Sequence, residues 1–155
     1  MKPFSKVVVA GVMVAAAGLL AAGKAMSMGK KCLFSEVQGV VLSNNQPVAG
    51  AVVEREFRWT WKGEVGKDQT TTGPKGEFKL PAIYRSSIGS FLPHEPMVRQ
   101  TILIRHGGQT YKAWMLDKSN YDENGELQGK PIMISCRLET EPKHTGEVYG
   151  ICDLQ

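Results

Sequence analysis

The sequence lacks the patterns that most enzymes and nucleic-acid-binding proteins carry. Its serines include no G-x-S-x-G elbow, and no ordered Asp and His accompany them to orient a catalytic base. The 19 lysines and arginines are scattered among 15 acidic residues, which argues against a nucleic-acid surface. No stretch after the first 25 residues has helical periodicity, and no internal repeat is present. These absences favour a single non-enzymatic domain that is not α-helical and needs no cofactor.

The first 25 residues form the three-part pattern of a secretory signal peptide. Lys2 and Lys6 make a short positive region, residues 7–22 are uncharged and apolar, and residues 23–25 resemble a cleavage site. An uncleaved membrane anchor is the alternative, because the apolar run is shorter than the ~20 residues of a comfortable span. No lipobox cysteine and no paired arginines follow, so we expect general export to the periplasm or beyond. A membrane would then be contacted only through an uncleaved signal peptide.

The three cysteines are Cys32, Cys136 and Cys152, all after the predicted leader. In an oxidising compartment one disulfide is expected and one thiol is left over. Cys136 and Cys152 flank a polar excursion, residues 139–146, so a bridge between them would clamp the last strand to its predecessor. We favour this pairing over the two that include Cys32, and it would contribute about 3 kcal/mol in the chain-entropy model. Cys32 is expected just before the first strand.

Residues 26–155 form one predicted domain, long enough to bury its own core. Apolar and charged side chains alternate along residues 51–62, which indicates a strand with one buried and one wet face. The other expected strands are residues 37–42, 77–80, 101–105, 110–115, 131–138 and 148–152, and the expected polar loops are 63–72, 82–96 and 117–130. About seven short strands predict an all-β fold, an antiparallel β-sandwich.

Two motifs near the start of this domain carry a family resemblance. Residues 37–53 contain a G-x-V strand, a turn and the run P-V-A-G-A, and residues 72–81 contain a T-x-x-x-G-x-F turn and strand. They resemble the opening of carboxypeptidase regulatory-like domains, which share a transthyretin-like fold. Gly50 and Gly76 stand where the turns want positive φ, and Phe78 should point into the core. The rest of the chain is similar to exported bacterial proteins of this fold without an established activity, and fold does not imply function.

The aromatic strand face is a candidate binding surface. Trp59 and Trp61 share one parity of the expected strand, which would place their indoles about 7 Å apart. The simplest interpretation is that both fill the core. Arg55 has the same parity, however, and a core strand rarely buries an unpaired Arg, so one end of this face is expected to be open. Exposed Trp and Arg are enriched at protein-binding hot spots.

Residues 85–96 form the second candidate, a long irregular connection in a domain whose other connections are mostly short. Such loops are usually functional or disordered, and apolar side chains here argue against disorder. The segment either covers an edge strand or projects as a recognition loop. Its candidate binding residues are Arg85, His94 and Glu95.

Two further patterns are interpreted as structural. Residues 120–126 approach a calcium loop, but Asn120 replaces the usual Asp and Pro131 stands where a bidentate Glu should close the shell. A polar Asx-type turn is therefore expected. The histidines lie in three different loops, which is typical of solvated surface groups, and we expect no metal site. They are His94, His106 and His144.

The leading hypothesis is an exported, non-enzymatic β-sandwich that binds another macromolecule in the periplasm. The expected partner is another protein, and the most concrete form is an immunity or inhibitor protein. It rests on size, compartment and the absence of catalytic motifs. The alternative is a carbohydrate or small-ligand module that stacks its ligand on Trp59 and Trp61 beside Arg55. A hydrolase that uses His94 and Glu95 is a third hypothesis. The sequence specifies neither the partner nor the oligomeric state.

Overall fold

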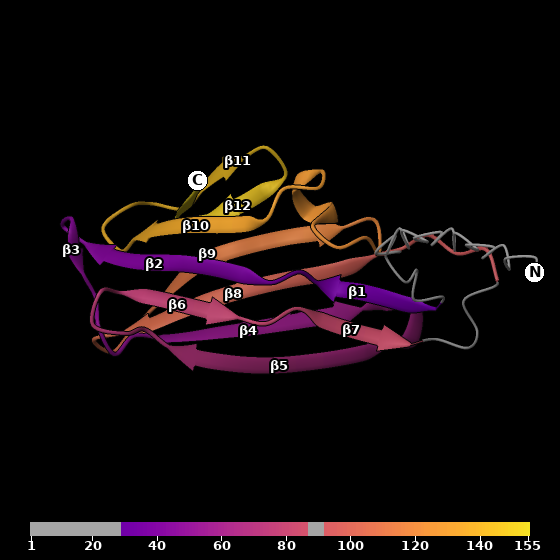
Figure 1. Cartoon of the computed structure of the whole chain (residues 1–155). Helices are drawn as coiled ribbons and strands as arrows, with labels where there is room; N and C mark the ends of the chain where they lie inside the picture. The colour runs from indigo at the N-terminus through magenta and orange to yellow at the C-terminus, as the bar shows by residue number, and fades with distance from the viewer. Residues whose placement is uncertain (1–28, 87–91) are drawn as a thin grey trace, which may run out of the picture.

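Thirteen strands and two short 3₁₀ turns make up the described part of the chain, residues 29–86 and 92–155 of a computed structural model (Figure 1). The predicted signal peptide lies outside these residues. Within them, no helix is long and apolar enough to cross a bilayer. The elements are β1 (Lys30–Phe34), β2 (Val37–Ser43), β3 (Gln46–Pro47), β4 (Val52–Trp59), η1 (Thr60–Lys62), β5 (Glu64–Thr71), β6 (Glu77–Leu80), β7 (Ile83–Ser86), β8 (Val98–His106), β9 (Gln109–Lys118), η2 (Gly125–Leu127), β10 (Ile132–Arg137), β11 (Lys143–Thr145), β12 (Val148–Gly150) and β13 (Cys152–Leu154).

The predicted all-β sandwich is confirmed. One sheet has six strands in the order β11-β12-β9-β8-β4-β5, and the other has the order β13-β10-β2-β3, with β6 also paired to β2. Strands β1 and β7 form a separate two-stranded pair. The pairing is antiparallel except between β2 and β10, which run parallel with Val37 opposite Ile132. The long chain segment between these two strands supplies the crossover that a parallel pair requires.

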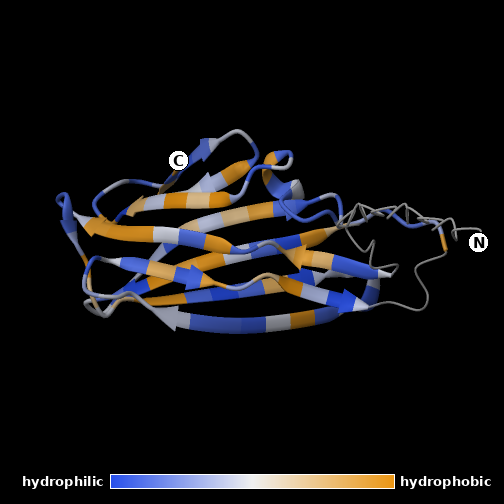
Figure 2. Cartoon of the chain, in the orientation of Figure 1, coloured by the Kyte–Doolittle hydropathy of each residue, from blue (hydrophilic) through white to orange (hydrophobic). Residues whose placement is uncertain are grey.

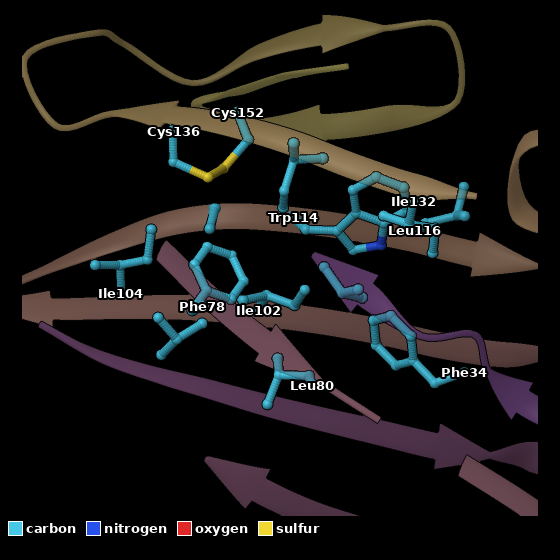
Figure 3. Packing of buried hydrophobic residues seen from close by; sticks show 14 of the residues in the cluster. Phe34, Phe78, Leu80, Ile102, Ile104, Trp114, Leu116, Ile132, Cys136 and Cys152 are labelled. Atoms are coloured by element: carbon cyan, nitrogen blue, oxygen red, sulfur yellow. A yellow bond between two sulfur atoms is a disulfide. The ribbon is translucent and has the colours of Figure 1, made fainter. Parts of the chain in front are cut away.

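The core lies between the two larger sheets. Figure 2 shows hydrophobic and hydrophilic residues alternating along the long strands, as a sheet with one buried face requires. Ile102 and Trp114 from the six-stranded sheet face Phe78, Leu80 and Ile132 from the other sheet, and all five are buried (Figure 3). Each such side chain contributes about 1.5–3 kcal/mol when it is removed from water. The inward orientation expected for Phe78 is therefore confirmed.

The favoured disulfide is present between Cys136 and Cys152 (Figure 3). These residues stand opposite each other on β10 and β13, so the bond holds the last strand to its neighbour. The expected position of Cys32 is wrong, because it lies within β1 rather than before the first strand. Cys32 is a buried free thiol, and its burial raises its pKa.

The expected loop at residues 63–72 is instead the edge strand β5. Its inward positions include Glu64 and Asp68, and a row of polar residues at such positions does not suggest a strand. Both carboxylates are paired with arginines, Glu64 with Arg85 and Asp68 with Arg55. Inward-pointing charges on an edge strand also discourage pairing with another chain.

The two turn glycines of the family resemblance have the conformation that was expected. Gly50 has φ +75° and Gly76 has φ +73°, a region that other residues rarely adopt. A Cβ on Gly76 would also lie 2.4 Å from the carbonyl oxygen of Val41. The turn before β6 therefore needs glycine for two separate reasons.

Candidate functional site

The candidate residues other than Arg55 gather at one end of the sandwich. At this end β4 and β9 finish, β5 and β8 begin, and the η1 turn joins β4 to β5 (the right-hand end in Figure 1). Residues 92–97 reach the same place before they enter β8. We call Trp59, Trp61, His94 and Tyr121 the aromatic cluster.

Trp59 is the buried base of the aromatic cluster, with only 2% of its surface exposed. It occupies the inward face of β4, as its parity predicts. Its indole Nε1 donates a hydrogen bond of 2.8 Å to the Tyr121 hydroxyl, and the two rings meet edge to face at 6.0 Å. Tyr121 belongs to the connection that follows β9, so this contact fixes that connection against β4.

Trp61 does not share a strand face with Trp59, which corrects the predicted pair of indoles. The strand ends at Trp59, and Trp61 lies in the 3₁₀ turn η1, which closes at Gly63 with φ +62°. The half-buried indole of Trp61 packs against the core and stacks on the His94 ring, with centroids 4.0 Å apart and planes 16° apart. One face of this indole is therefore already covered.

His94 is half-buried rather than a solvated surface group. Its Nδ1 lies 3.0 Å from the carbonyl oxygen of Leu92, and its Nε2 lies 2.9 Å from the Tyr121 hydroxyl. Glu95 beside it is exposed, and no ion pair of Glu95 with another described residue is present. The two side chains therefore do not form a pair of ligands.

The three histidines do not converge. His106 ends β8 in the hairpin at the opposite end of the strands, and His144 packs against Tyr149 with ring centroids 4.9 Å apart. Among residues 29–86 and 92–155, no three His, Cys, Asp or Glu side chains are placed to hold a metal ion.

Arg85 reaches the same end from β7. Its Nε donates a 2.7 Å hydrogen bond to Glu64, and its guanidinium lies 5.4 Å from the centroid of the Phe57 ring. The ion pair joins β7 to the start of β5, two strands that belong to different sheets. Arg85 is therefore a partly exposed residue at this end that ties the β1–β7 pair to the edge of the six-stranded sheet.

Arg55 is not part of an open face, which corrects the prediction made for it. The residue is 1% exposed, its guanidinium forms a two-pronged ion pair with Asp68, and it lies 5.0 Å from the Phe34 ring centroid. Its Nη1 has no hydrogen-bond partner among the described residues. The ion pair with Asp68 thus compensates the buried charge of Arg55, and Arg55 belongs to the interior of the sandwich.

Tyr121 and Lys31 belong to the site but were not predicted. Tyr121 makes three contacts: its hydroxyl hydrogen-bonds to Trp59 and His94 of the cluster, and its carbonyl oxygen accepts a 3.0 Å hydrogen bond from the backbone of Cys32. The Lys31 ammonium lies 4.0 Å from the Tyr121 ring centroid. The aromatic ring within an otherwise polar loop was the one available signal for Tyr121.

A second tyrosine, Tyr84, lies beside the cluster on β7. Lys30 lies over its ring at 4.1 Å. Burial, together with the nearby Glu123 carboxylate, raises the pKa of Tyr84 to about 12. Lysines 30 and 31 of β1 therefore each cover one tyrosine of this end.

The loop that carries Tyr121 is anchored by a buried ion pair between Lys118 and Glu126, with N and O 3.1 Å apart. Glu126 also accepts hydrogen bonds from Ser35 and Gln100. Burial opposes its charge, but Gln100, Lys118 and Ser35 together hold the pKa of Glu126 below its usual value. The expected Asx-type turn is confirmed, since the Asn120 side chain accepts from the backbone of Asp122 and donates to that of Gly125.

Two exposed apolar side chains flank His94, and a third lies on the outer face of the neighbouring strand β5. Val65 follows η1 on β5, and Leu92 and Met97 flank His94 in the segment that enters β8. The backbone of Met97 accepts a 3.2 Å hydrogen bond from Thr60, so this segment lies directly against η1. We call Val65, Leu92 and Met97 the apolar rim.

Comparison with protein-family models matches residues 37–141 to a domain of unknown function (DUF6795). No curated protein matches the chain. No solved structure matches it either. The matched segment begins with β2 and ends after β10, so it contains the whole aromatic cluster but not β1. The transthyretin-like resemblance of residues 37–81 stays a prediction.

Proposed function

Because the chain belongs to the DUF6795 family, whose description specifies no activity, we propose its function from the geometry of the aromatic cluster. We propose an exported, non-enzymatic protein that binds another protein through the apolar rim and the exposed edge of the cluster. Its most concrete form is an immunity or inhibitor protein of the periplasm. The proposal retains the function expected from the sequence and moves its docking surface from a strand face to one end of the sandwich.

One observation carries this proposal. Two exposed apolar side chains, Leu92 and Met97, lie in the segment whose His94 stacks on the half-buried Trp61, and a third, Val65, lies on the outer face of β5 at the same end of the sandwich. Exposed apolar side chains that gather at one place mark binding sites, whereas scattered ones do not, and aromatic residues are typical binding anchors. The charged side chains nearby, such as Lys62 and Glu95, would form the polar rim of such an interface.

Contacts within the protein hold the proposed docking surface in one conformation. Trp59 and the Lys118–Glu126 ion pair hold the Tyr121 loop, Tyr121 holds His94, and Thr60 holds Met97. A docking surface that is already ordered loses less conformational entropy on binding than a flexible one. The arrangement therefore supports binding at a small cost in conformational entropy.

The same geometry favours a protein partner over a carbohydrate. Sugar stacking needs a free aromatic face, whereas Trp59 is buried and His94 covers one face of Trp61. The geometry gives catalysis little support. The hydroxyl that hydrogen-bonds to His94 belongs to Tyr121, and it already accepts a hydrogen bond from Trp59. The Trp59 indole, the Tyr121 hydroxyl and the His94 ring thus hydrogen-bond to one another, whereas the Trp61 Nε1 has no partner among the described residues.

Site-specific photo-crosslinking tests the proposal. A photoreactive amino acid replaces Leu92 or Met97 in the full-length chain, and crosslinked products from the producing cell are identified by mass spectrometry. Met133 on the opposite sheet is the matched control, because Met97 and Met133 are each 45% exposed. We expect the same single protein from positions 92 and 97 and none from position 133. Equal products from all three positions, or none from 92 and 97, would contradict the proposal.

Export is tested separately by the intact mass of the protein. Loss of residues 1–25 from protein in the periplasmic fraction would support export with cleavage. Full-length protein in the membrane fraction would support the anchor instead. Full-length protein in the cytosol would contradict export in either form.

A further inference from the structure

A hollow of about 500 Å³ lies on the outer face of the six-stranded sheet, where the β11–β12 hairpin adjoins β9. Its walls include Arg99 from β8, Asp117 from β9, and Glu147 and Tyr149 from the hairpin. Ligand cavities in proteins measure about 300–1,000 Å³. This hollow therefore has room for a long side chain of a partner.

The charged groups that line the hollow leave one carboxylate without a counter-charge. The Asp117 carboxylate accepts two hydrogen bonds from Arg99, at 2.8 and 2.9 Å, so this pair is neutral as a whole. Glu147 is exposed and makes no ion pair with another described residue. His144, which also lines the hollow, packs against the Tyr149 ring with the planes 47° apart. The hollow thus combines an aromatic ring with an unpaired carboxylate, and a cation complements both.

Elsewhere the protein completes the same combination with an arginine. In two places a guanidinium lies 5.0 or 5.4 Å from the centre of an aromatic ring and also pairs with a carboxylate. The two sets are Arg55 with Phe34 and Asp68, and Arg85 with Phe57 and Glu64. Arginine suits such a set better than lysine, because its planar group stacks on a ring and its fork of N–H donors matches a carboxylate. Tyr149 and Glu147 supply the other two parts of such a set, and the hollow beside them has room for the arginine.

We propose that the partner protein places an arginine side chain in this hollow, with the guanidinium against Tyr149 and paired to Glu147. The inference rests on the proposed function, because it names the chemistry that the partner presents beside the apolar rim. The rim adjoins the hollow along β8. Val98 is fully buried, so Met97 before it and Arg99 after it both face outward.

The rim also reaches the hollow across the strands. Val65 stands opposite Arg58, Arg58 opposite Arg99, and Arg99 opposite Asp117, and all four side chains are exposed. Three strand spacings amount to about 15 Å. This span is shorter than the width of an interface that buries about 800 Å² on each partner. A partner that covers Val65 and Met97 can therefore reach the hollow with one side chain.

The first test uses the full-length protein and a small probe, N-acetyl-arginine amide, at about pH 8, where histidine side chains are neutral. NMR follows the Tyr149 ring resonances during a titration into the millimolar range. We expect a saturable shift and about tenfold weaker binding to Glu147→Gln, as for the loss of a charged hydrogen-bond acceptor. Glu141→Gln, which changes an exposed acid at the other end of the hairpin, should bind the probe as the natural protein does.

The matched probe is N-acetyl-citrulline amide, which has nearly the same shape without the charge and should cause no saturable shift. An equal response to both probes, equal binding by Glu147→Gln, or no saturable shift with the arginine probe would overturn the arginine site.

The second test measures docking through the photoreactive amino acid at position 97. Glu147→Lys places a positive charge against the incoming arginine, so crosslinking should fall about tenfold or more, whereas Glu141→Lys should leave it unchanged. Unchanged crosslinking of Glu147→Lys overturns the arginine anchor but leaves the docking surface standing. No crosslinking from position 97 in any version overturns the proposed function, while the probe titration still decides whether the hollow binds a guanidinium.

Discussion

The Trp59 indole donates a 2.8 Å hydrogen bond to the Tyr121 hydroxyl, which joins β4 to a loop 62 residues further along the chain. Removing the hydroxyl leaves a buried N–H group without its partner. We expect Tyr121→Phe to lower the free energy of unfolding by about 1–3 kcal/mol, measured by urea denaturation. Tyr111→Phe is the matched control, because its hydroxyl donates to an exposed neighbour, Gln109. Equal small effects of the two substitutions would contradict a structural role for this bond.

The disulfide between Cys136 and Cys152 closes a segment with a sequence separation of 16. Replacing both cysteines with serine should lower the free energy of unfolding by about 3 kcal/mol, because the unfolded chain regains the entropy that the closed loop had removed. A reducing agent should destabilise the natural protein by a similar amount and have no further effect on the double variant. Additional destabilisation of that variant by the reductant would show that the disulfide is not its target.

Period-two alternation predicted the inward face of β4 but not where the strand ends. Phe57 and Trp59 are buried as the alternation requires. The same alternation continues to Trp61, so the predicted strand was too long. The chain leaves the sheet at η1, and Gly63 completes the turn with a positive φ. The position of Trp61 is fixed by its stack on His94, a contact between distant segments that no local pattern encodes.

Strand β5 was missed for a related reason. Glu64, Gly66 and Asp68 occupy its inward positions, and such residues are typical of loops. They are tolerated because Arg85 and Arg55 neutralise the two acids and because the Phe57 ring fills the space beside Gly66. These partners come from other strands, so only the folded chain brings them together.

The sequence singled out most of the site residues but misjudged how they are arranged. Trp59, Trp61, Arg85 and His94 do lie at one end of the molecule, although they were assigned to two separate surfaces. The residue that links them is Tyr121. It lies in a stretch that resembles a calcium loop, and that stretch was interpreted from its polar residues alone. An aromatic ring in a polar loop is a signal worth weighing when such a loop contains no complete set of ligands.

The buried pair of Lys118 and Glu126 makes stability depend on pH. The pKa of Glu126 is lowered in the folded protein, so the unfolded chain binds more protons and stability rises with pH across this range. The contribution of Glu126 should thus be present above its ordinary value of 4.5 and be lost as the pH falls through the lower folded value. Glu126→Gln should flatten this acid dependence in urea titrations, and it should cost about 3–5 kcal/mol at neutral pH because Lys118 loses its partner.

The control for this prediction is Asp117→Asn. Arg99 also lowers the pKa of Asp117, but this ion pair is exposed to solvent. Exposed pairs contribute only about 0–1 kcal/mol, so the substitution should change the stability at neutral pH very little. If Asp117→Asn cost as much as Glu126→Gln, burial would not be the cause of the difference.

Arg55 and Asp68 should show strong coupling, because Arg55 is fully buried while its partner is half-buried on the edge strand. Asp68→Asn leaves a buried guanidinium without its counter-charge and should cost about 2–4 kcal/mol in the free energy of unfolding. Arg55→Met keeps much of the side-chain volume and removes the charge, so the double variant should be more stable than Asp68→Asn alone. Urea denaturation of the two single variants and the double variant gives the coupling energy directly. Additive effects would mean that the buried Arg55 gains nothing from Asp68, and that another group or a bound water compensates its charge.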